Sequence, residues 1–358
     1  MRPLFLALLA LTLHAEPLRV AIAGLNHGHV TGFLRAAQAR PNDITIVAIW
    51  DPEQALLTKY ASSHRFQPNQ LFTDLNKLLD STKPDAVASF SDTFAHLQIV
   101  QAAAPRHIPV MMEKPLAVST QHARAIQKLS QANNTPVFVN YETTWYRSHG
   151  EIWNLMHQQK AAGPIRRLVA MDGHQGPREI GVPDEFFNWL NDPKKNGGGA
   201  LFDFGCYGAN LMTWLLDNQR PTKVTAITHT TKPQIYTKVD DEATILLDYP
   251  QTQGIIQASW NWPYSRKDFE VYGATGYAIA TGGNSLRTRL GTAKTEDART
   301  PADLKPTEAD SISYLVNIVR NKQKPTGLSS LENNVIVTEI LEAARESART
   351  GKTVTLPQ

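Results

Sequence analysis

The sequence predicts an α/β protein with an N-terminal doubly wound parallel sheet and a C-terminal α+β domain whose open sheet is mostly antiparallel. Three observations carry this prediction. The 358 residues are enough for two domains of ordinary size. Strand and helix patterns alternate in the first part of the chain, which is typical of a parallel sheet covered on both faces. After about residue 150, strand patterns follow one another across short turns, which favours an antiparallel sheet.

The first domain is expected over residues 16–140, where apolar runs predict buried strands and helical spacing predicts the helices between them. The strands expected in order are residues 18–23, 44–50, 85–90, 108–112 and 136–139, and the helices are residues 30–40, 75–79, 96–104 and 120–132. Ligands of a doubly wound sheet bind at the carboxyl ends of its strands. Candidate site residues are therefore sought where these strands end.

The second domain is expected over residues 141–358. Its strands are predicted at residues 244–249, 254–262 and 269–272, and a turn at 250–254 joins the first two. Near the end of the chain, Ser329 and Glu332 form a capping-box pattern. This pattern predicts a helix that begins at Leu331 and ends at Gly351.

Composition excludes several classes of protein. Hydrophobic residues make up 42% and charged residues 19% of the chain, which excludes a disordered, collagen-like or coiled-coil protein. A net charge of +3 without a basic cluster gives no electrostatic support for a nucleic-acid partner. Cys206 is the only cysteine, which excludes an intramolecular disulfide and a multi-cysteine metal site.

The first 15 residues have the pattern of a secretory signal peptide. Arg2 precedes an apolar run from Leu4 to Leu13, and the small residue Ala15 follows. The run is too short to span a bilayer, so we expect no membrane association after cleavage before Glu16. A buried N-terminal strand or helix is the alternative. With a signal peptide, the mature protein would be periplasmic or secreted.

The turn after the first strand is the first candidate binding site. It reads Gly24-Leu25-Asn26-His27-Gly28-His29 and leads into a helix. A dinucleotide fingerprint has glycine first for a tight turn, a small second residue that lets the backbone approach the pyrophosphate, and a small third residue that lets the helix pack closely. Only Gly24 meets this pattern, because Asn26 and His29 occupy the other two positions. A plain strand-to-helix turn is the alternative.

Asp51 ends the second strand, about 27 residues after Gly24. A carboxylate there accepts hydrogen bonds from ribose hydroxyls and repels a 2′-phosphate, so the sequence favours NAD over NADP. A surface aspartate in a turn is the alternative. Gly24, Asn26, His27 and Asp51 are thus cofactor-binding candidates in a Rossmann-type domain. His27 and His29 could also suggest a metal, but no third ligand is indicated and we expect no metal site.

Two further segments carry residues suited to chemistry. Residues 110–115 form a buried strand that ends on Glu113, Lys114 and a proline, which stops the strand and holds Lys114 at the ligand-binding edge. Residues 197–210 begin with three glycines and continue as a predicted helix. Helical spacing places Asp203, Tyr207 and Asn210 on one face of this helix.

These motifs resemble those of the Gfo/Idh/MocA family of NAD(P)-dependent oxidoreductases, over essentially the whole chain after the signal segment. Residues 113–115 are similar to the family's Glu-Lys-Pro motif. Residues 197–210 are similar to its Gly-Gly-Gly and Asp-x-Gly-x-His/Tyr-x-x-Asp/Asn segment. His96 before a helix, and Gly273 with Gly276 in the second sheet, add to the likeness.

The resemblance implies that Lys114 lies beside the nicotinamide and the reacting carbon, with Glu113 near the nicotinamide ribose. It implies that Asp203 and Tyr207 face the substrate from the second domain. Many relatives have histidine at the position of Tyr207, and the tyrosine form is similar to that of glucose-fructose oxidoreductase and dihydrodiol dehydrogenase.

The resemblance also implies cofactor contacts from Ser91 and His96, and association of the chain into a homo-oligomer. The sequence departs from the family at residues 91–93, where Ser-Asp-Thr stands in place of Thr-Pro-Asn, and at Asn26 in the glycine turn. These departures concern the phosphate and nicotinamide contacts and leave the predicted fold unchanged.

The expected catalytic residues are Lys114, Tyr207 and Asp203. When hydride leaves an alcohol carbon, the hydroxyl proton must leave too, so a base must sit within about 3 Å of that oxygen. The ordinary tyrosine pKa near 10 is too high for this task at neutral pH. We expect the Lys114 ammonium to lower the pKa of Tyr207, so that the two form a proton relay. Asp203 would orient the lysine or bind a sugar hydroxyl. A core tyrosine, a surface lysine and a structural aspartate are the alternatives.

The substrate candidates are polar and aromatic side chains in segments expected to reach the pocket. They are Trp145, His174, Arg266 and Asn210. Aromatic planes with convergent hydroxyl-binding groups suit a sugar ring. Each residue alone is also compatible with a core or rim position.

These residues together predict an exported NAD-dependent oxidoreductase, similar to sugar dehydrogenases, that transfers hydride between a tightly bound cofactor and a sugar, polyol or cyclic alcohol. Two alternatives stay open. One is an NAD-dependent glycoside hydrolase that acts by transient oxidation, elimination, water addition and reduction. The other is a catalytically silent carbohydrate-binding protein. The expected partners are a small carbohydrate-like substrate and further copies of this chain.

Overall fold

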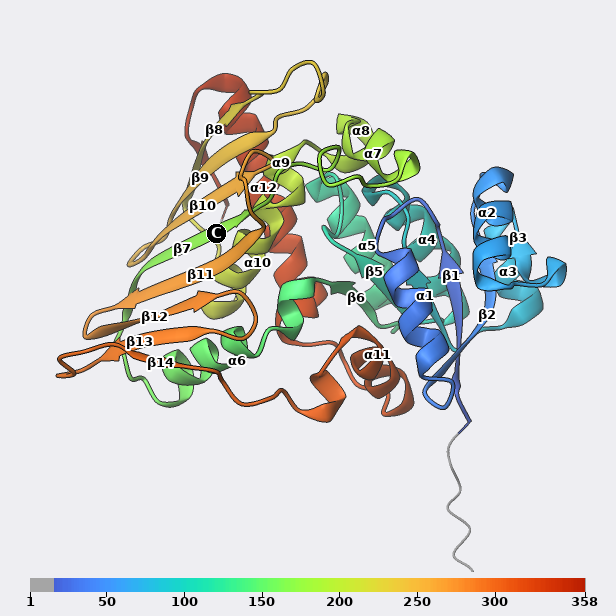
Figure 1. The fold of residues 1–358 in the computed structure, drawn as a ribbon, viewed down its shortest axis with the longest axis horizontal. Coiled ribbons are helices and arrows are strands. Elements are labelled where there is room, and N and C mark those ends of the chain that lie inside the picture. The colour runs from blue at the N-terminus through green and yellow to red at the C-terminus, as the bar shows by residue number, and fades with distance from the viewer. Residues whose placement is uncertain (1–15, 358) are drawn as a thin grey trace, which may run out of the picture.

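The computed structural model describes residues 16–357, so the predicted signal segment lies outside the described residues. The chain forms two sheets (Figure 1). Helix α12 (Leu331–Thr350) joins them, because it packs on β8 of the second sheet and on α5 of the first half. No helix within residues 16–357 combines the length and the apolar character that crossing a bilayer requires.

Six parallel strands form the first sheet, in the order β3-β2-β1-β4-β5-β6. The strands are β1 (Leu18–Ala23), β2 (Ile44–Trp50), β3 (Leu71–Phe72), β4 (Ala86–Ser89), β5 (Val110–Glu113) and β6 (Val137–Asn140). The helices between them are α1 (Val30–Ala39), α2 (Gln54–His64), α3 (Leu75–Thr82), α4 (His96–Ala103) and α5 (Thr120–Ala132). Every strand pair is parallel, which confirms the predicted doubly wound sheet.

Both faces of the first sheet are buried, because successive side chains of a strand point to opposite faces. Val20 and Ile22 of β1 pack in one core, and Ala21 packs in the other. Helix α11 (Ser311–Arg320) adds Leu315 to the first of these cores. The chain therefore returns to the first sheet after it has completed the strands β7 to β14 of the second.

Nine strands form the second sheet, in the order β14-β13-β12-β11-β7-β10-β9-β8-β15. Strands β7 (Ile165–Gly173) and β10 (Gln253–Ser259) pair in parallel, and the other pairs are antiparallel, as predicted for most of this sheet. The other strands are β8 (Lys223–His229), β9 (Glu242–Asp248), β11 (Arg266–Gly273), β12 (Gly276–Thr281), β13 (Leu286–Leu290), β14 (Asp297–Arg299) and β15 (Val354–Thr355).

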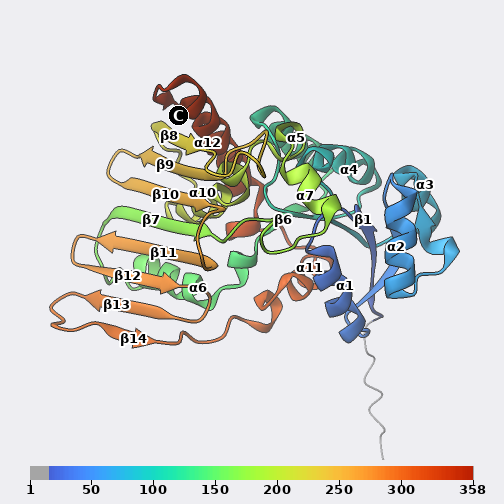
Figure 2. The same ribbon diagram turned by 45° about the horizontal axis from the view of Figure 1, so that its top comes forward.

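Helices cover one face of the second sheet (Figure 2). They are α6 (Arg147–Trp153), α10 (Gly205–Leu215) and α12, while α7 (Asp184–Leu190), α8 (Pro193–Asn196) and α9 (Ala200–Asp203) lie in the connection before α10. Glu142–Trp145 form a 3₁₀ turn, η4, directly after β6. This turn carries the chain from the first sheet to the second.

Two local predictions are wrong. Residues 197–210 are not one helix, because α9 and α10 separate at Phe204. The two helices have different anchors: the Asp240 carboxylate accepts the N–H of Gly199 and Leu201 at the start of α9, whereas Gly208 packs α10 closely onto β7 and β10.

The cap of α12 is the second wrong prediction. Ser330, not Ser329, caps the helix, and its hydroxyl accepts the N–H of Asn333. Ser329 ends a short 3₁₀ turn, while Ser330 has the extended backbone that an N-cap residue requires. The predicted end at Gly351 is confirmed, with a left-handed φ of 67°.

We expect the free energy of unfolding to fall in acid because of His149 on α6. Its ring is buried, and burial lowers the pKa of His149 to about 4. The unfolded chain takes up this proton near 6.5, so the contribution of His149 to stability is complete above that pH and is lost as the pH falls toward 4. We expect wild type to lose about 2 kcal/mol of unfolding free energy between pH 7 and pH 5 from this group.

Urea unfolding at both pH values measures this loss. His149→Gln should show a pH dependence smaller by about that amount, whereas His107→Gln, which removes an exposed imidazole, should behave like wild type. An unchanged pH dependence in His149→Gln would contradict the assignment.

Candidate active site

The glycine turn lies where β1, β2 and β4 end. Gly24 has a φ of +90°, and a Cβ there would lie 2.6 Å from the backbone of Ser91, so the turn requires glycine. The Asp51 carboxylate accepts the N–H of Leu25 at 2.7 Å and that of Glu53 at 2.8 Å. Burial raises the pKa of Asp51. Asp51 therefore lies at the predicted strand end and fastens the glycine turn to it.

A pocket of about 440 Å³ opens beside this turn. Gly24 and Asp51 line it from the ends of β1 and β2, Ser91 from the loop after β4, Gln98 from α4 and Lys195 from α8. This volume suits one nucleoside half of a dinucleotide. The residues present thus fit a nucleotide cofactor whose ribose lies near Asp51.

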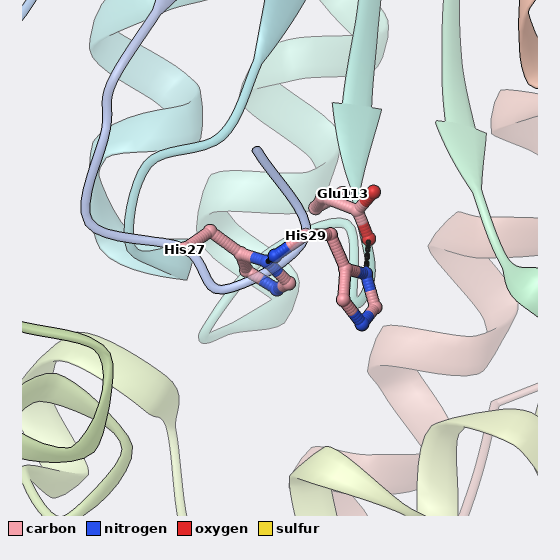
Figure 3. Close-up of side chains that lie close together, drawn as sticks. All are labelled: His27, His29 and Glu113. Carbon is pink, nitrogen blue, oxygen red and sulfur yellow. Dashed lines mark hydrogen bonds and ion pairs between the residues drawn. The ribbon is translucent and has the colours of Figure 1, made fainter. Parts of the chain in front are cut away.

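Two histidines of the glycine turn stand beside Glu113 at the end of β5 (Figure 3). The Nδ1 atom of His29 lies 3.0 Å from a carboxylate oxygen of Glu113. The rings of His27 and His29 meet edge to face, with 4.6 Å between their centroids. Burial, the largest cause, keeps the pKa of His27 well below its ordinary value, so this ring is neutral.

The sequence indicated no third side chain that could join the two histidines around a metal, but the structure supplies one. The candidate ligand atoms of His27, His29 and Glu113 lie within 4.8 Å of one another. Hydrogen bonds already use two of the imidazole nitrogens, since His27 Nδ1 accepts the N–H of His29 at 3.2 Å and His29 Nδ1 bonds to Glu113. We therefore interpret the group as a hydrogen-bonded cluster that joins the turn to β5.

Lys114 and Asp203 form a buried ion pair between the two halves of the molecule. The ammonium contacts one carboxylate oxygen of Asp203 and donates to its main-chain oxygen at 3.1 Å. The other carboxylate oxygen accepts the indole N–H of Trp260 at 2.9 Å. Burial opposes both charges, but the partners prevail, so the pKa of Lys114 is raised and that of Asp203 is lowered. Both groups are ionised at neutral pH, and the lysine is fixed in place.

The predicted lowering of the pKa of Tyr207 is wrong. The Lys114 ammonium does lie 5.1 Å from the centre of the tyrosine ring. Burial nevertheless raises the pKa of Tyr207 well above its ordinary value, and the carboxylate of Glu142 adds to this effect. The ammonium has little influence because Asp203 already neutralises it. Tyr207 keeps its proton at neutral pH and can serve as a hydrogen-bond donor.

A second ammonium stands beside the same tyrosine. Lys267 Nζ lies 4.7 Å from the ring centre of Tyr207 and forms an ion pair with Glu142. Asp172 on β7 is the sheet neighbour of Lys267, and burial raises the pKa of this carboxyl group well above its ordinary value. Tyr207 is therefore flanked by two lysine–carboxylate pairs, with the buried Asp172 carboxyl group next to the second.

The substrate candidates divide into two groups. His174 lies beside Phe204, with 4.8 Å between ring centroids, and burial lowers its pKa. Arg266 pairs with Asp268 at the start of β11, directly before Lys267. His174 therefore lies near the charges of Asp203, Lys114 and Lys267, whereas Arg266 points to the face of β11 opposite Lys267.

Trp145 and Asn210 have other partners. The Trp145 indole donates to the side-chain oxygen of Asn140 at 3.0 Å. The side-chain N–H of Asn140 in turn donates to Glu113. Asn210 is fully buried and donates to the main-chain oxygen of Leu328 at 2.8 Å. The structure does not bring Asn210 to the site, because α10 turns this position toward α12.

The remaining cofactor candidates lie around the glycine turn. Ser91 is buried, and its hydroxyl donates to the main-chain oxygen of Asp92 at 3.1 Å. His96 is buried, with Nδ1 3.1 Å from the main-chain oxygen of Leu116 and with Nε2 lacking a partner. The main-chain oxygen of Asn26 accepts the indole N–H of Trp189 at 2.9 Å.

Helix α7 of the second half covers the glycine turn. Trp189 of this helix donates its indole N–H to Asn26, and the ring centroid of Phe186 lies 4.6 Å from that of His27. A Cβ at Gly28 would lie 2.7 Å from the Phe186 ring. The predicted nucleotide site is therefore enclosed by both halves of the chain.

Sequence reasoning missed three residues of the site: Asn140, Lys267, and His29 as the partner of Glu113. Asn140 ends β6, so the strand-end rule could have found it if the predicted strand had been one residue longer. Lys267 lies on an antiparallel strand with no motif around it. His29 stood in the fingerprint, but nothing local in the sequence indicated its pairing with a residue 84 positions away.

Two family models match the chain. The oxidoreductase model with an NAD-binding Rossmann fold, GFO/IDH/MocA, matches residues 18–141, and the model of the GFO/IDH/MocA C-terminal domain matches residues 155–279. Among curated proteins, trans-1,2-dihydrobenzene-1,2-diol dehydrogenase from Xenopus laevis is 28% identical over 155 residues, which are 42% of this chain and 41% of that protein. The chain thus spans about two fifths of this relative.

Solved structures are similar over nearly the whole chain. Aldose-aldose oxidoreductase from Caulobacter crescentus, complexed with glycerol, has a TM-score of 0.81 at 20% identity and covers 95% of this chain and 100% of its own. An inositol dehydrogenase homolog from Azotobacter vinelandii, complexed with NAD⁺, has a TM-score of 0.82 at 18% identity and covers 96% and 98%. At these identities the likeness concerns the fold.

Proposed function

Because this chain belongs to the GFO/IDH/MocA family of oxidoreductases with an NAD-binding Rossmann domain, we propose that it transfers hydride between NAD and a hydroxyl-bearing carbon of a sugar, polyol or cyclic alcohol. The observation that carries the proposal is the buried Lys114–Asp203 pair beside Tyr207, at the strand edge that also holds the glycine turn. The relatives named above are a diol dehydrogenase, an aldose-aldose oxidoreductase complexed with glycerol, and a homolog of inositol dehydrogenase. Vicinal hydroxyls are common to these diols, sugars and polyols.

Lys114, Asp203 and Tyr207 would each have a separate role in the proposed reaction. The bound nicotinamide supplies the hydride acceptor. The Lys114 ammonium, fixed by Asp203, stabilises negative charge that develops on the substrate oxygen. Tyr207 donates a hydrogen bond from its protonated hydroxyl. Burial of these three side chains excludes water, which strengthens each of these interactions.

A substrate panel tests this function. Purified protein would be mixed with NAD⁺ and with aldoses, inositols, glycosides and cyclic diols, while the absorbance of NADH is recorded. We expect turnover with at least one compound that carries vicinal hydroxyls. No reduction of NAD⁺, whether bound or added, by any of these compounds would contradict the proposal.

Asp51 should set the choice between NAD and NADP. Asp51→Asn removes the negative charge but keeps a side-chain oxygen that can accept the N–H of Leu25. We expect the ratio of NAD⁺ to NADP⁺ affinities to fall at least about tenfold, because the charged hydrogen bond to ribose and the repulsion of a 2′-phosphate are both lost. Binding titrations followed by protein fluorescence measure this ratio. An unchanged ratio would show that Asp51 does not face the ribose.

We further propose that the protein is exported, to the periplasm or beyond, and keeps its cofactor bound. The pattern of residues 1–15 supports export, and free nicotinamide nucleotides are scarce outside the cytoplasm. The cover formed by Phe186 and Trp189 over the glycine turn supports slow release of a nucleotide held beneath it. Mass spectrometry of the supernatant after denaturation should detect about one nicotinamide nucleotide per chain, and its absence would refute retention.

We also propose a homo-oligomer formed through the second sheet. Ile227 on β8 and Leu246 on β9 are large apolar side chains that are 63% and 42% exposed. They lie on the same face, because Leu246 pairs with Thr225, two residues from Ile227. Light scattering should give a mass of two chains or more, and a monomer at micromolar concentration would contradict this assembly.

A further inference from the structure

His29 and Glu113 form a hydrogen-bonded dyad to which the proposed mechanism assigns no catalytic role. We propose that His29, oriented by Glu113, is an additional acid–base residue of this site and accepts the hydroxyl proton of the substrate during hydride transfer. The inference rests on the proposed function and names the proton acceptor that this function requires.

The geometry of the dyad is that of an oriented base. Glu113 is 2% exposed, and one of its oxygens bonds to Nδ1 of His29 at 3.0 Å. Its other oxygen accepts the side-chain N–H of Asn140 at 2.8 Å, and Trp145 in turn donates to Asn140 at 3.0 Å. A carboxylate held in this way fixes both the orientation and the tautomer of its histidine partner.

The free nitrogen of His29 is available to a ligand. Figure 3 shows this second nitrogen, Nε2, on the side of the ring that points away from Glu113. The His29 side chain is 46% exposed, so it can exchange a proton with solvent after each turnover. With Nδ1 donating to Glu113, Nε2 carries the lone pair that a general base needs.

Three other side chains of the site already hold a hydrogen where the substrate proton would have to bind. The neutral ring of His174 accepts the N–H of Gly176 with Nδ1 at 2.9 Å, so its other nitrogen carries the hydrogen and has no free lone pair. The pKa of Tyr207 is raised by burial, and that of Lys114 is raised by Asp203 against the effect of burial. Imidazole is the side chain suited to gain and lose a proton near neutral pH. A relay from Lys114 to Tyr207 alone would therefore leave the substrate proton without an acceptor.

The charged and titratable groups around His29 come from three elements. Neutral His27 lies beside it in the turn, Glu113 and then Lys114 follow at the end of β5, and the Glu142 carboxylate acts on it from η4. Helix α7 contributes only the aromatic rings that pack on His27. His29 thus lies among two carboxylates, one ammonium and a neutral imidazole.

The step balances with NAD⁺ as the oxidant. Hydride leaves the carbon for the nicotinamide ring, the O–H bond breaks as the C=O bond forms, and the proton binds to Nε2 of His29. His29 then returns the proton to solvent. The net reaction converts alcohol and NAD⁺ into carbonyl compound, NADH and one proton.

Imidazole rescue tests the inference on the active protein. We expect His29→Ala to lower kcat/KM about 10²-fold, and we expect added imidazole to restore at least tenfold of this loss, because the position is open to solvent. His64→Ala, which removes an imidazole from the end of α2, serves as the control and should show neither effect. A loss below threefold, or a loss that imidazole does not repair, would overturn the role.

The number of protons released when NAD⁺ binds tests the inference without turnover. The cationic nicotinamide of NAD⁺ disfavours a proton on a nearby imidazole, so nucleotide-free wild type should release protons when it binds NAD⁺. Calorimetry in two buffers of different ionisation enthalpy counts these protons. His29→Gln should release fewer protons than wild type, and equal release would overturn the inference. Since no substrate is present, this result is independent of the substrate panel, whose failure would instead refute the proposed function.

Discussion

Replacement of Lys114 by methionine is expected to lower kcat/KM by a factor of at least about 10³, because one preorganised charge at a developing oxyanion accounts for an effect of that size. The substitution also leaves the Asp203 carboxylate buried without its partner. Breaking a buried pair in this way costs about 3–5 kcal/mol of stability. Activity and folding must therefore be measured separately.

The double variant Lys114→Met/Asp203→Asn separates the two effects. Removal of both charges should recover part of the unfolding free energy, measured in urea, because no unpaired charge remains buried. It should recover none of the activity. If activity returned together with stability, Lys114 would be a structural residue and the proposed mechanism would lose its central group.

Tyr207→Phe is expected to lower kcat/KM about 10²-fold or more, with little change in stability. The variant keeps the ring, which packs against Phe204 and Tyr141, and removes only the hydroxyl. Because burial holds the pKa of Tyr207 far above neutral, the hydroxyl acts as a donor and not as a base. The fractional loss should therefore be the same at pH 6 and at pH 9.

Steady-state kinetics over this pH range check the prediction. Tyr249→Phe is the control, since it deletes the hydroxyl of another buried tyrosine, which follows β9 and has no proposed role. A loss in Tyr207→Phe that grows with pH would mean that the phenolate acts as the base, and it would favour the relay first expected from the sequence.

The sequence predicted the fold well because the relevant signals are local. Apolar runs such as residues 18–23 and 110–112 predict buried strands, and the helices between them follow from spacing and caps. The same local rules placed Gly24, Asp51 and Lys114 correctly at strand ends. These rules failed at Phe204, where different contacts fix the two parts of the predicted helix. The helix divides there, and Asn210 is turned into the core.

The site itself depends on contacts between distant parts of the chain. Lys114 meets Asp203 across 89 positions, and His29 meets Glu113 across 84. The residues next to a group in the sequence do not reveal its burial or its distance in space from other charged groups. Burial and this distance decide whether the group is charged. For this reason the pKa of Tyr207 was predicted in the wrong direction.

By itself, the sequence determined the two-sheet architecture, the glycine turn and the motif residues that supply the chemistry, because these depend on periodicity, backbone conformation and residue type. Only the tertiary structure decided which of those residues meet, which of them carry charge and which nitrogen of His29 bonds to Glu113. The physical reason is that the pKa of a group and the free energy of an ion pair depend on the solvent and partners around it, and folding alone brings these together.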